Sequence, residues 1–153
     1  MTLYRTLKEK GFGVHTIGPA ATLDQAVGEL VRFNIGSLIV CESAAKGTDV
    51  QMIGIITERD ILRAQNAHEA PLDQLTVGHA MTSDLITAEP GMEIEEAMRL
   101  MTKHRVRHLP VMERERLLEI VSIGDVMNAQ LQELTLSTWH MSRELQDRAG
   151  MWT

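Results

Sequence analysis

A pattern of apolar residues occurs twice along the chain, and it strongly limits the possible folds. Seven pairs match at a constant spacing of 71 residues: Pro19 and Pro90, Leu23 and Ile94, Ala26 and Ala97, Leu30 and Met101, Ile35 and Val106, Leu38 and Leu109, and Val40 and Val111. The spacing then falls to 65 residues for three more pairs: Ile55 and Ile120, Thr57 and Ser122, and Asp60 and Asp125. A register that survives a length difference in one loop, here at residues 42–51, indicates a tandem repeat. One unit is too short to bury its own apolar face, so we expect the two to pack together.

Each copy contains an apolar run that leads directly into a helix. A hydroxyl residue follows the run, as Thr57 or Ser122, and an aspartate stands three positions later, as Asp60 or Asp125. This pattern is typical of a capping box, in which the hydroxyl accepts a first-turn N–H and the carboxylate reaches back. Helix capping alone therefore explains both pairs, and a ligand site is the alternative.

The repeat divides the chain into five parts. We predict an N-terminal helix or arm over residues 1–10, a first repeat over 11–66, a linker over 67–76, a second repeat over 77–128 and a C-terminal amphipathic helix over 129–153. Apolar runs and turn residues predict strands at 14–17, 37–41, 52–57, 85–87, 109–112 and 117–122. Helices are expected from the capping box at 22–25, from 58 to about 66, over 93–103 and from 125 onward. The fold class is therefore α+β, with two β-α-β-β-α units.

The last helix carries a regular apolar stripe. Its members follow one another at alternating steps of four and three: Met127, Leu131, Leu134, Thr138, Met141 and Leu145. This is the a/d seam of a coiled coil. Packing along its own domain and self-association or docking explain the stripe equally well.

Charge and motifs exclude several functions. The 153 residues include 21 acidic and 15 basic residues, a net charge of −6, which argues against nucleic acid as a partner. No apolar run approaches the roughly 20 residues of a membrane span, and no signal peptide is visible, so we expect a cytoplasmic protein without membrane contact. The six histidines lack metal-ligand spacing and no catalytic fingerprint is present, so we expect neither a metal, nor a catalytic residue, nor an enzyme. Cys41, inside an apolar run, is predicted to be a buried, inert thiol.

Four features of the sequence together resemble a pair of cystathionine-β-synthase (CBS) domains. They are the paired β-α-β-β-α units and three segments: residues 54–62 (GIITERDIL), residues 105–111 (RVRHLPV) and residues 77–82 before the second unit. The resemblance covers residues 11–128, and the small stand-alone prokaryotic type is the most similar. It implies two repeats packed about a pseudo-twofold axis with two clefts between them, followed here by the C-terminal helical extension.

The resemblance also implies a ligand. Such clefts commonly bind AMP, ADP, ATP, NAD(H) or S-adenosylmethionine, and the hydroxyl-x-x-Asp motif forms the ribose site. Carried onto this chain, Asp60 and Asp125 would accept hydrogen bonds from ribose hydroxyls, with Thr57 and Ser122 close to the sugar or phosphate. Charge-assisted bonds of this kind contribute about 1.5–3 kcal/mol each.

The two clefts are expected to differ. In the regulatory subunit of AMP-activated protein kinase, basic residues just before the second strand contact the phosphate of a ligand whose ribose lies on the partner repeat. The matching residues here are Arg107 and His108, which would serve the Thr57/Asp60 cleft with Arg59 nearby; the alternative is a solvated strand edge. Gly36 and Ser37 match them in the first repeat, and Ile123 and Gly124 replace Glu58 and Arg59 in the second.

Two further features bear on the clefts. Residues around the first strands are implied to contact adenine: His15, Thr16, Thr87 and Ala88. Glu119 stands where the family usually has glycine, as at Gly54, and residues 113–116 replace a glycine-containing turn. If Glu119 faces the cleft it would repel a phosphate, which weakens the second site.

We therefore expect a non-enzymatic regulatory module that binds an adenine nucleotide, needs no obligatory cofactor, forms a homodimer and signals to an effector protein encoded elsewhere. The alternative is a dimeric scaffold with empty or vestigial clefts, and a small nucleotide-processing hydrolase is a third reading. Segment 66–77 and the C-terminal helix are the expected moving parts.

Overall fold

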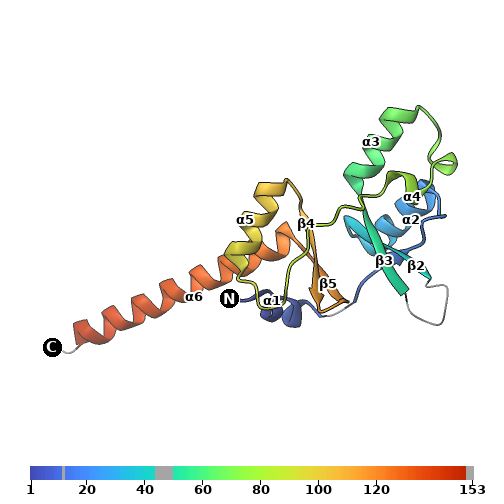
Figure 1. The fold of residues 1–153 in the computed structure, drawn as a ribbon. Helices are drawn as coiled ribbons and strands as arrows, with labels where there is room; N and C mark the ends of the chain where they lie inside the picture. The colour runs from blue at the N-terminus through green and yellow to red at the C-terminus, as the bar shows by residue number, and fades with distance from the viewer. Residues whose placement is uncertain (12, 44–49, 151–153) are drawn as a thin grey trace. The chain divides into compact units, whose positions relative to one another are not determined.

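The structure is a computed structural model that describes residues 1–11, 13–43 and 50–150. The chain forms two compact units, one of residues 13–86 and one of residues 1–12 with 87–153. The N-terminal segment therefore belongs to the same unit as the second repeat (Figure 1). The predicted connection at residues 42–51 lies largely outside the described residues.

The unit of residues 13–86 is a three-stranded sheet with helices. Its elements are β1 (Thr16–Ile17), α2 (Leu23–Phe33), β2 (Ser37–Ser43), β3 (Val50–Thr57), α3 (Glu58–His68), the 3-10 helix η1 (Leu72–Gln74) and α4 (Val77–Ala80). The strand order is β1-β2-β3, with β1 parallel and β3 antiparallel to β2. The first strand has only two residues, fewer than predicted, and α4 was not predicted at all.

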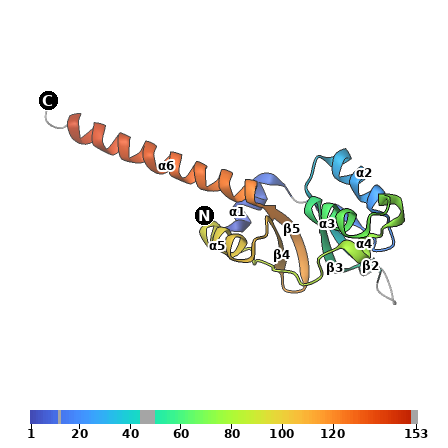
Figure 2. The same ribbon diagram turned by 90° about the horizontal axis from the view of Figure 1, so that it is seen from above.

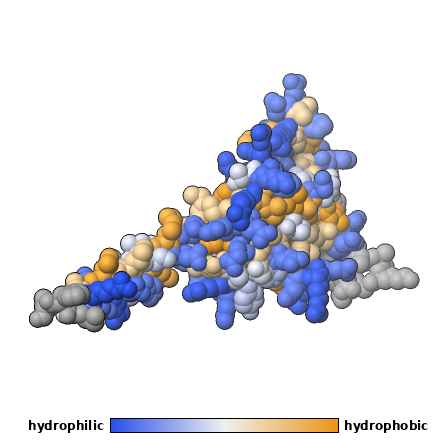
Figure 3. Space-filling model, turned by 60° about the vertical axis from the view of Figure 1, so that its left-hand side comes forward, coloured by the Kyte–Doolittle hydropathy of each residue, from blue (hydrophilic) through white to orange (hydrophobic). Residues whose placement is uncertain are grey.

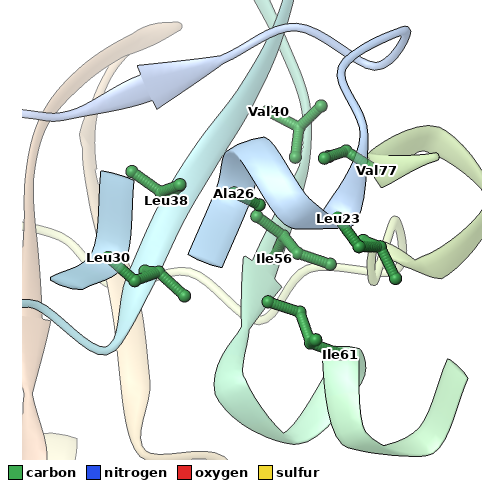
Figure 4. Close-up of a cluster of buried hydrophobic side chains, with 8 residues drawn as sticks. All are labelled: Leu23, Ala26, Leu30, Leu38, Val40, Ile56, Ile61 and Val77. Carbon is green, nitrogen blue, oxygen red and sulfur yellow. The ribbon is translucent and has the colours of Figure 1, made fainter. Parts of the chain in front are cut away.

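The core of this unit lies between α2 and the sheet. Thr22 caps α2 by accepting the N–H of Gln25, and the Gln25 side chain returns a bond to the Thr22 N–H, which confirms the predicted capping box. Figure 4 shows the cluster that this orientation buries: Leu23, Ala26, Leu30, Leu38, Val40, Ile56, Ile61 and Val77. Every member is at most 6% exposed, so the apolar periodicity in the sequence identified the packing face.

The segment predicted as a linker is tied to the first repeat. The Leu23 N–H donates to the Leu75 carbonyl at 2.8 Å, and the Val77 N–H donates to the Ala21 carbonyl at 2.8 Å. These two bonds and the packing of Leu72 and Leu75 against the core hold the second part of this segment on the first repeat.

The second unit contains α1 (Leu3–Lys10), α5 (Ile94–His104), β4 (His108–Glu113), β5 (Arg116–Ser122) and α6 (Ile123–Gly150). Strands β4 and β5 form an antiparallel pair. The strand predicted at 85–87 is not present: only Ala88 pairs, in parallel, with Val111. Ala88 is the counterpart of Ile17, so the second repeat keeps one pair where β1 has two.

Helix α1 packs against the second repeat. Leu3 and Leu7 are fully buried, and the Leu3 N–H donates to the Met92 carbonyl at 2.8 Å. Figures 1 and 2 show α1 beside the first part of α6 and the end of β5. The N-terminal segment is therefore part of the second unit's core.

Helix α6 is one continuous helix of 28 residues, so the predicted extension at 129–153 begins without a break. Val126 and Ala129 are buried against the unit, but residues 134–150 are all exposed. At 1.5 Å per residue the helix is about 42 Å long. Figure 2 shows its second half running beyond the rest of the unit.

Cys41 is partly exposed rather than buried, a correction, because it lies beside the irregular pairing between Val40 and Cys41. Its partial burial raises the pKa of its thiol.

Among the described residues, no helix has the length and apolar character needed to cross a membrane.

Candidate functional site

The first candidate site lies where β3 leads into α3. Thr57 is extended, and its hydroxyl oxygen accepts the Asp60 N–H at 3.3 Å. The Asp60 Oδ2 atom accepts the Thr57 N–H and the Thr57 hydroxyl, both at 2.9 Å. The predicted capping box is confirmed, and it holds the carboxylate at the positive end of α3.

Thr82 completes the surroundings of Asp60. Its hydroxyl donates to Asp60 Oδ1 at 3.1 Å, and its backbone exchanges two 2.9 Å bonds with Ile55. Asp60 is only 9% exposed, and among the described residues its carboxylate meets hydroxyl and amide donors but no cation. An ionised carboxylate has about four acceptor positions, so three are used and one remains.

Gly54 allows this arrangement. A Cβ at this position would lie 2.7 Å from the Met81 sulfur and 2.9 Å from the Thr82 carbonyl oxygen. Any side chain here would push the Met81–Thr82 segment off the strand and remove the Thr82 hydroxyl from Asp60. The glycine is therefore needed for the approach of this segment.

The second candidate site, at the start of α6, repeats the capping geometry. The Ser122 N–H donates to Asp125 Oδ2 at 2.8 Å, and the Asp125 N–H donates to Ser122 Oγ at 3.2 Å. Here, however, the neighbour from outside the motif is a cation. Lys10 Nζ donates to the same Asp125 Oδ2 at 3.0 Å and to the Ile120 carbonyl at 3.1 Å.

The surroundings of Asp125 change its acidity. Burial acts to raise the pKa of this carboxyl, but the Ser122 N–H, the Lys10 ammonium and the Ser122 hydroxyl outweigh it, so the pKa lies below its ordinary value. The side chains of Asp125 and Lys10 are 23% and 41% exposed, so the ion pair is partly shielded from water.

Lys10 makes in the second unit the contacts that Thr82 makes in the first. Thr82 donates to Asp60 and to the Ile55 carbonyl; Lys10 donates to the equivalent pair, Asp125 and the Ile120 carbonyl. The sequence reasoning missed both residues. The signal was present, because extending the 71-residue spacing upstream places Lys10 opposite Met81, next to Thr82.

The predicted phosphate ligands lie at the start of β4. His108 pairs directly with Ser122 across the strands and is half-buried, whereas Arg107 is exposed. The Arg107 carbonyl accepts the Ile123 N–H at 2.8 Å. The structure thus places both residues beside the Ser122 end of their own repeat, and their assignment to the Thr57/Asp60 cleft stays a prediction.

The remaining predicted residues are more scattered. Arg59 is exposed on the first turn of α3, and Thr16 is exposed on β1, which β2 separates from β3. Thr87 is exposed beside the buried Ala88, and the half-buried His15 stacks on Phe33 with ring centroids 3.8 Å apart.

Glu119 is 4% exposed, and its Oε1 accepts the N–H of Ile120 at 2.9 Å. The described residues contain no group of three or more side chains placed to hold a metal ion.

Comparison with known proteins agrees with the repeat. The family model for the CBS domain matches residues 13–67 and 77–132. The chain is 38% identical over 114 residues to the mitochondrial CBS domain-containing protein CBSX3 of Arabidopsis thaliana, a match that covers 73% of this chain and 54% of that protein. It is 30% identical over 118 residues to the CBS domain-containing protein YhcV of Bacillus subtilis, covering 77% and 79%. The crystal structure of a CBS-domain protein from Agrobacterium tumefaciens superposes with a TM-score of 0.77 at 35% identity, over 85% of this chain and 99% of that one.

Proposed function

Because the chain belongs to the CBS-domain family, with two repeats in an α+β fold and a C-terminal helical extension, we propose that it is a sensor that binds an adenosine-containing ligand at Thr57 and Asp60. CBS pairs act in general as regulatory modules. The proposed ligands are AMP, ADP, ATP or NAD(H), bound reversibly as a signal and not as an obligatory cofactor. The proposal assigns no catalytic residue.

The donors around Asp60 carry the proposal. Its carboxylate accepts hydrogen bonds from the Thr57 N–H, the Thr57 hydroxyl and the Thr82 hydroxyl, and it keeps one acceptor position open. One ribose hydroxyl would take the open position and the other would replace the Thr82 hydroxyl. That exchange trades one neutral donor for another, so it loses little hydrogen-bond energy.

Asp125 is the weaker site on the same reasoning. The Lys10 ammonium pairs with the Asp125 carboxylate through a charge-assisted bond to Oδ2, and among the described residues no cation meets Asp60. A ribose hydroxyl would therefore meet at Asp125 a carboxylate whose charge is already partly neutralised, so its hydrogen bond should be weaker than at Asp60. We therefore expect one ligand per chain to bind well and a second to bind weakly or not at all.

The basic residues Arg59, Arg107 and His108 are proposed to contact the phosphates of the ligand. Arg59 is on the same first helical turn as Asp60, where the helix N-terminus also favours negative charge. The roles of Thr16 and Thr87 at the adenine stay predictions, as do the homodimer, the effector protein and the cytoplasmic location.

A dimeric scaffold with unused clefts is the second candidate. It is favoured by a specific observation: Asp60 and Asp125 both act as helix caps, and Lys10 already engages Asp125. In this reading the capping geometry that both motifs share serves folding alone. Binding measurements separate the two candidates.

The test is isothermal titration calorimetry and thermal shift with AMP, ADP, ATP, NADH and S-adenosylmethionine. We expect micromolar binding of at least one of them, with a rise in Tm. Asp60→Asn should abolish binding, because the amide presents one acceptor and no charge. If none of the five binds more tightly than about 1 mM, roughly −4 kcal/mol, the scaffold function replaces this one.

A lost helix cap needs its own control. Gln25→Ala removes the equivalent reciprocal bond at α2, so it should weaken the fold by a similar amount and leave the affinity for the nucleotide unchanged. Equal loss of affinity in Gln25→Ala and Asp60→Asn would assign the effect to stability and contradict the ribose role.

A further inference from the structure

Helix α6 exposes large apolar side chains along its length that nothing in its own unit covers. The exposed fractions are 50% or more for each of these residues: Met127, Leu131, Leu134, Leu136, Trp139, Met141 and Leu145. Figure 3 shows apolar side chains along the projecting arm of the molecule. Most helical stability in proteins comes from packing of an apolar face, so the exposed segment 134–150 would gain stability from a partner.

The seam, defined as Met127, Leu131, Leu134, Thr138, Met141 and Leu145, is suited to another helix. Thr138 does not interrupt it, because its hydroxyl donates to the Leu134 carbonyl at 2.9 Å and its methyl group remains for packing. The positions that flank the seam carry a single charge among them: Asn128, Gln130, Thr135, Ser137, Ser142 and Glu144. Such flanks allow two identical seams to meet without charge repulsion.

A groove between α5 and α6 continues the seam on one side. It has a volume of about 610 Å³ and is lined by Glu95, Met98, Arg99, Thr102, Lys103 and Gln130. Gln130 precedes the seam residue Leu131, and its Oε1 atom is buried without a hydrogen-bond partner among the described residues. The groove thus lies on the side of α6 that Gln130 occupies, next to the seam.

The charges of the groove are complementary to those of one edge of the helix end, although the same segment also carries Arg143 and Arg148. The groove carries Arg99 and Lys103 against one acidic residue, Glu95. Near its C-terminus α6 carries Glu144 and Asp147 three residues apart, on the same side of the seam as Gln130. Only an antiparallel partner helix brings this acidic edge to the groove, because a parallel one would place Thr135 there.

We propose that a second copy of this chain packs its α6 antiparallel along the seam and inserts Glu144 and Asp147 into the α5–α6 groove beside Arg99 and Lys103. In this register Leu134 lies opposite Thr138 of the other copy, and Met127 lies opposite Leu145. The inference deepens the homodimer named in the proposed function and does not depend on nucleotide binding. A lipid surface fits less well, since membrane-bound amphipathic helices carry a Lys/Arg-rich polar face, which α6 lacks.

The first test is the mass of the full chain in solution, measured by size-exclusion chromatography with light scattering. The wild type should be a dimer at micromolar concentration. Leu134→Asp should be a monomer, while Leu136→Asp should remain a dimer, because two residues along a helix turn through about 200° and place Leu136 on the other side. Circular dichroism and Tm verify that both variants are folded.

Each outcome decides the inference. A monomeric wild type, a dimeric Leu134→Asp or an equal effect of both substitutions would overturn it. A dimeric Leu134→Asp would still leave the homodimer of the proposed function standing, on another surface. Nucleotide affinity, measured separately, tells whether the sensor role survives.

Orientation is tested by disulfide cross-linking in a Cys41→Ser background. In the antiparallel register the two copies of Ser137 face each other, so Ser137→Cys should cross-link to its own copy. Leu131→Cys should not, because in that register Leu131 faces Met141. Cross-linking of Leu131→Cys and not of Ser137→Cys would mean a parallel pair and overturn the proposal.

The groove contact is tested by charge exchange. Glu144→Lys should weaken the dimer by about two- to fivefold, the range of one exposed ion pair. Adding Lys103→Glu to the same chain should restore the affinity, whereas Lys103→Glu alone should weaken it. If the single variants left the dimer affinity unchanged, or if the double variant dimerised more weakly than either single variant, Glu144 and Asp147 would not lie in the groove.

Discussion

Lys10 Nζ lies 3.0 Å from Oδ2 of Asp125 and 3.1 Å from the carbonyl oxygen of Ile120, residues that follow it by 115 and 110 positions in the sequence. This contact makes the two hydroxyl-x-x-Asp motifs unequal, although their capping bonds match closely. The first aspartate is neighboured by a hydroxyl and the second by an ammonium. Four measurements follow from this difference and from the packing around it.

Replacing Lys10 should strengthen nucleotide binding at the second site, at Ser122 and Asp125. Lys10→Met removes the ammonium but keeps an unbranched chain, so we expect a loss of stability of about 0–1 kcal/mol in urea unfolding. It should also raise the number of nucleotides bound per chain, measured by calorimetry, because the ammonium no longer neutralises the charge of the Asp125 carboxylate. Lys8→Met, an exposed residue of the same helix, is the control and should change neither quantity.

Asp125 should make stability depend on acid pH. Its pKa in the folded protein lies below the ordinary value of 3.8, so the ionised carboxylate stabilises the folded state. This contribution is fully present above the unfolded pKa of about 4 and is lost as pH falls through the folded pKa. The difference in unfolding free energy between wild type and Asp125→Asn should therefore shrink between about pH 5 and pH 2. A difference that grew in this range would mean that the folded pKa is raised.

Gly54→Ala should destabilise the first unit. The added Cβ would meet the Thr82 carbonyl oxygen at 2.9 Å, a backbone atom that moves only with its segment. The expected cost is about 1–3 kcal/mol, measured by chemical unfolding. Gly28→Ala is a matched control in the interior of α2, where the new methyl meets nothing within 4 Å. It should stabilise the protein by about 0.5–1 kcal/mol, so destabilisation by both would argue against the close approach at Gly54.

Thr82→Val should separate the structural role of this hydroxyl from ligand binding. The substitution keeps the shape but removes the bond to Asp60, so stability should fall by about 0.5–1.5 kcal/mol. Affinity for the nucleotide should stay the same or rise, because the Asp60 oxygen that Thr82 occupies becomes available. If Thr82→Val instead bound the nucleotide much more weakly than the wild type, Thr82 itself would contact the ligand.

Local patterns predicted much of the fold. The capping boxes at Thr22, Thr57 and Ser122 each form within four residues, and all three are present. The predicted strand at residues 85–87 failed for the opposite reason, since a strand exists only where a partner pairs with it, and here only Ala88 does. Two-residue β1 and the packed linker are further cases in which distant contacts decided the local structure.

The candidate sites divide in the same way. Sequence spacing identified Thr57, Asp60, Ser122 and Asp125, because a repeat preserves its register. It did not identify Thr82 and Lys10 as their neighbours, because those contacts join segments from different parts of the chain.

The sequence by itself thus determined the two repeats, their helix starts and the apolar faces that pack. These features depend on periodicity and on bonds between near neighbours. Only the tertiary structure decided that α1 joins the second repeat, that an ammonium engages one aspartate and a hydroxyl the other, and that α6 leaves its seam exposed. The physical reason is that burial and charge pairing depend on which surfaces meet, and spacing along a chain does not specify that.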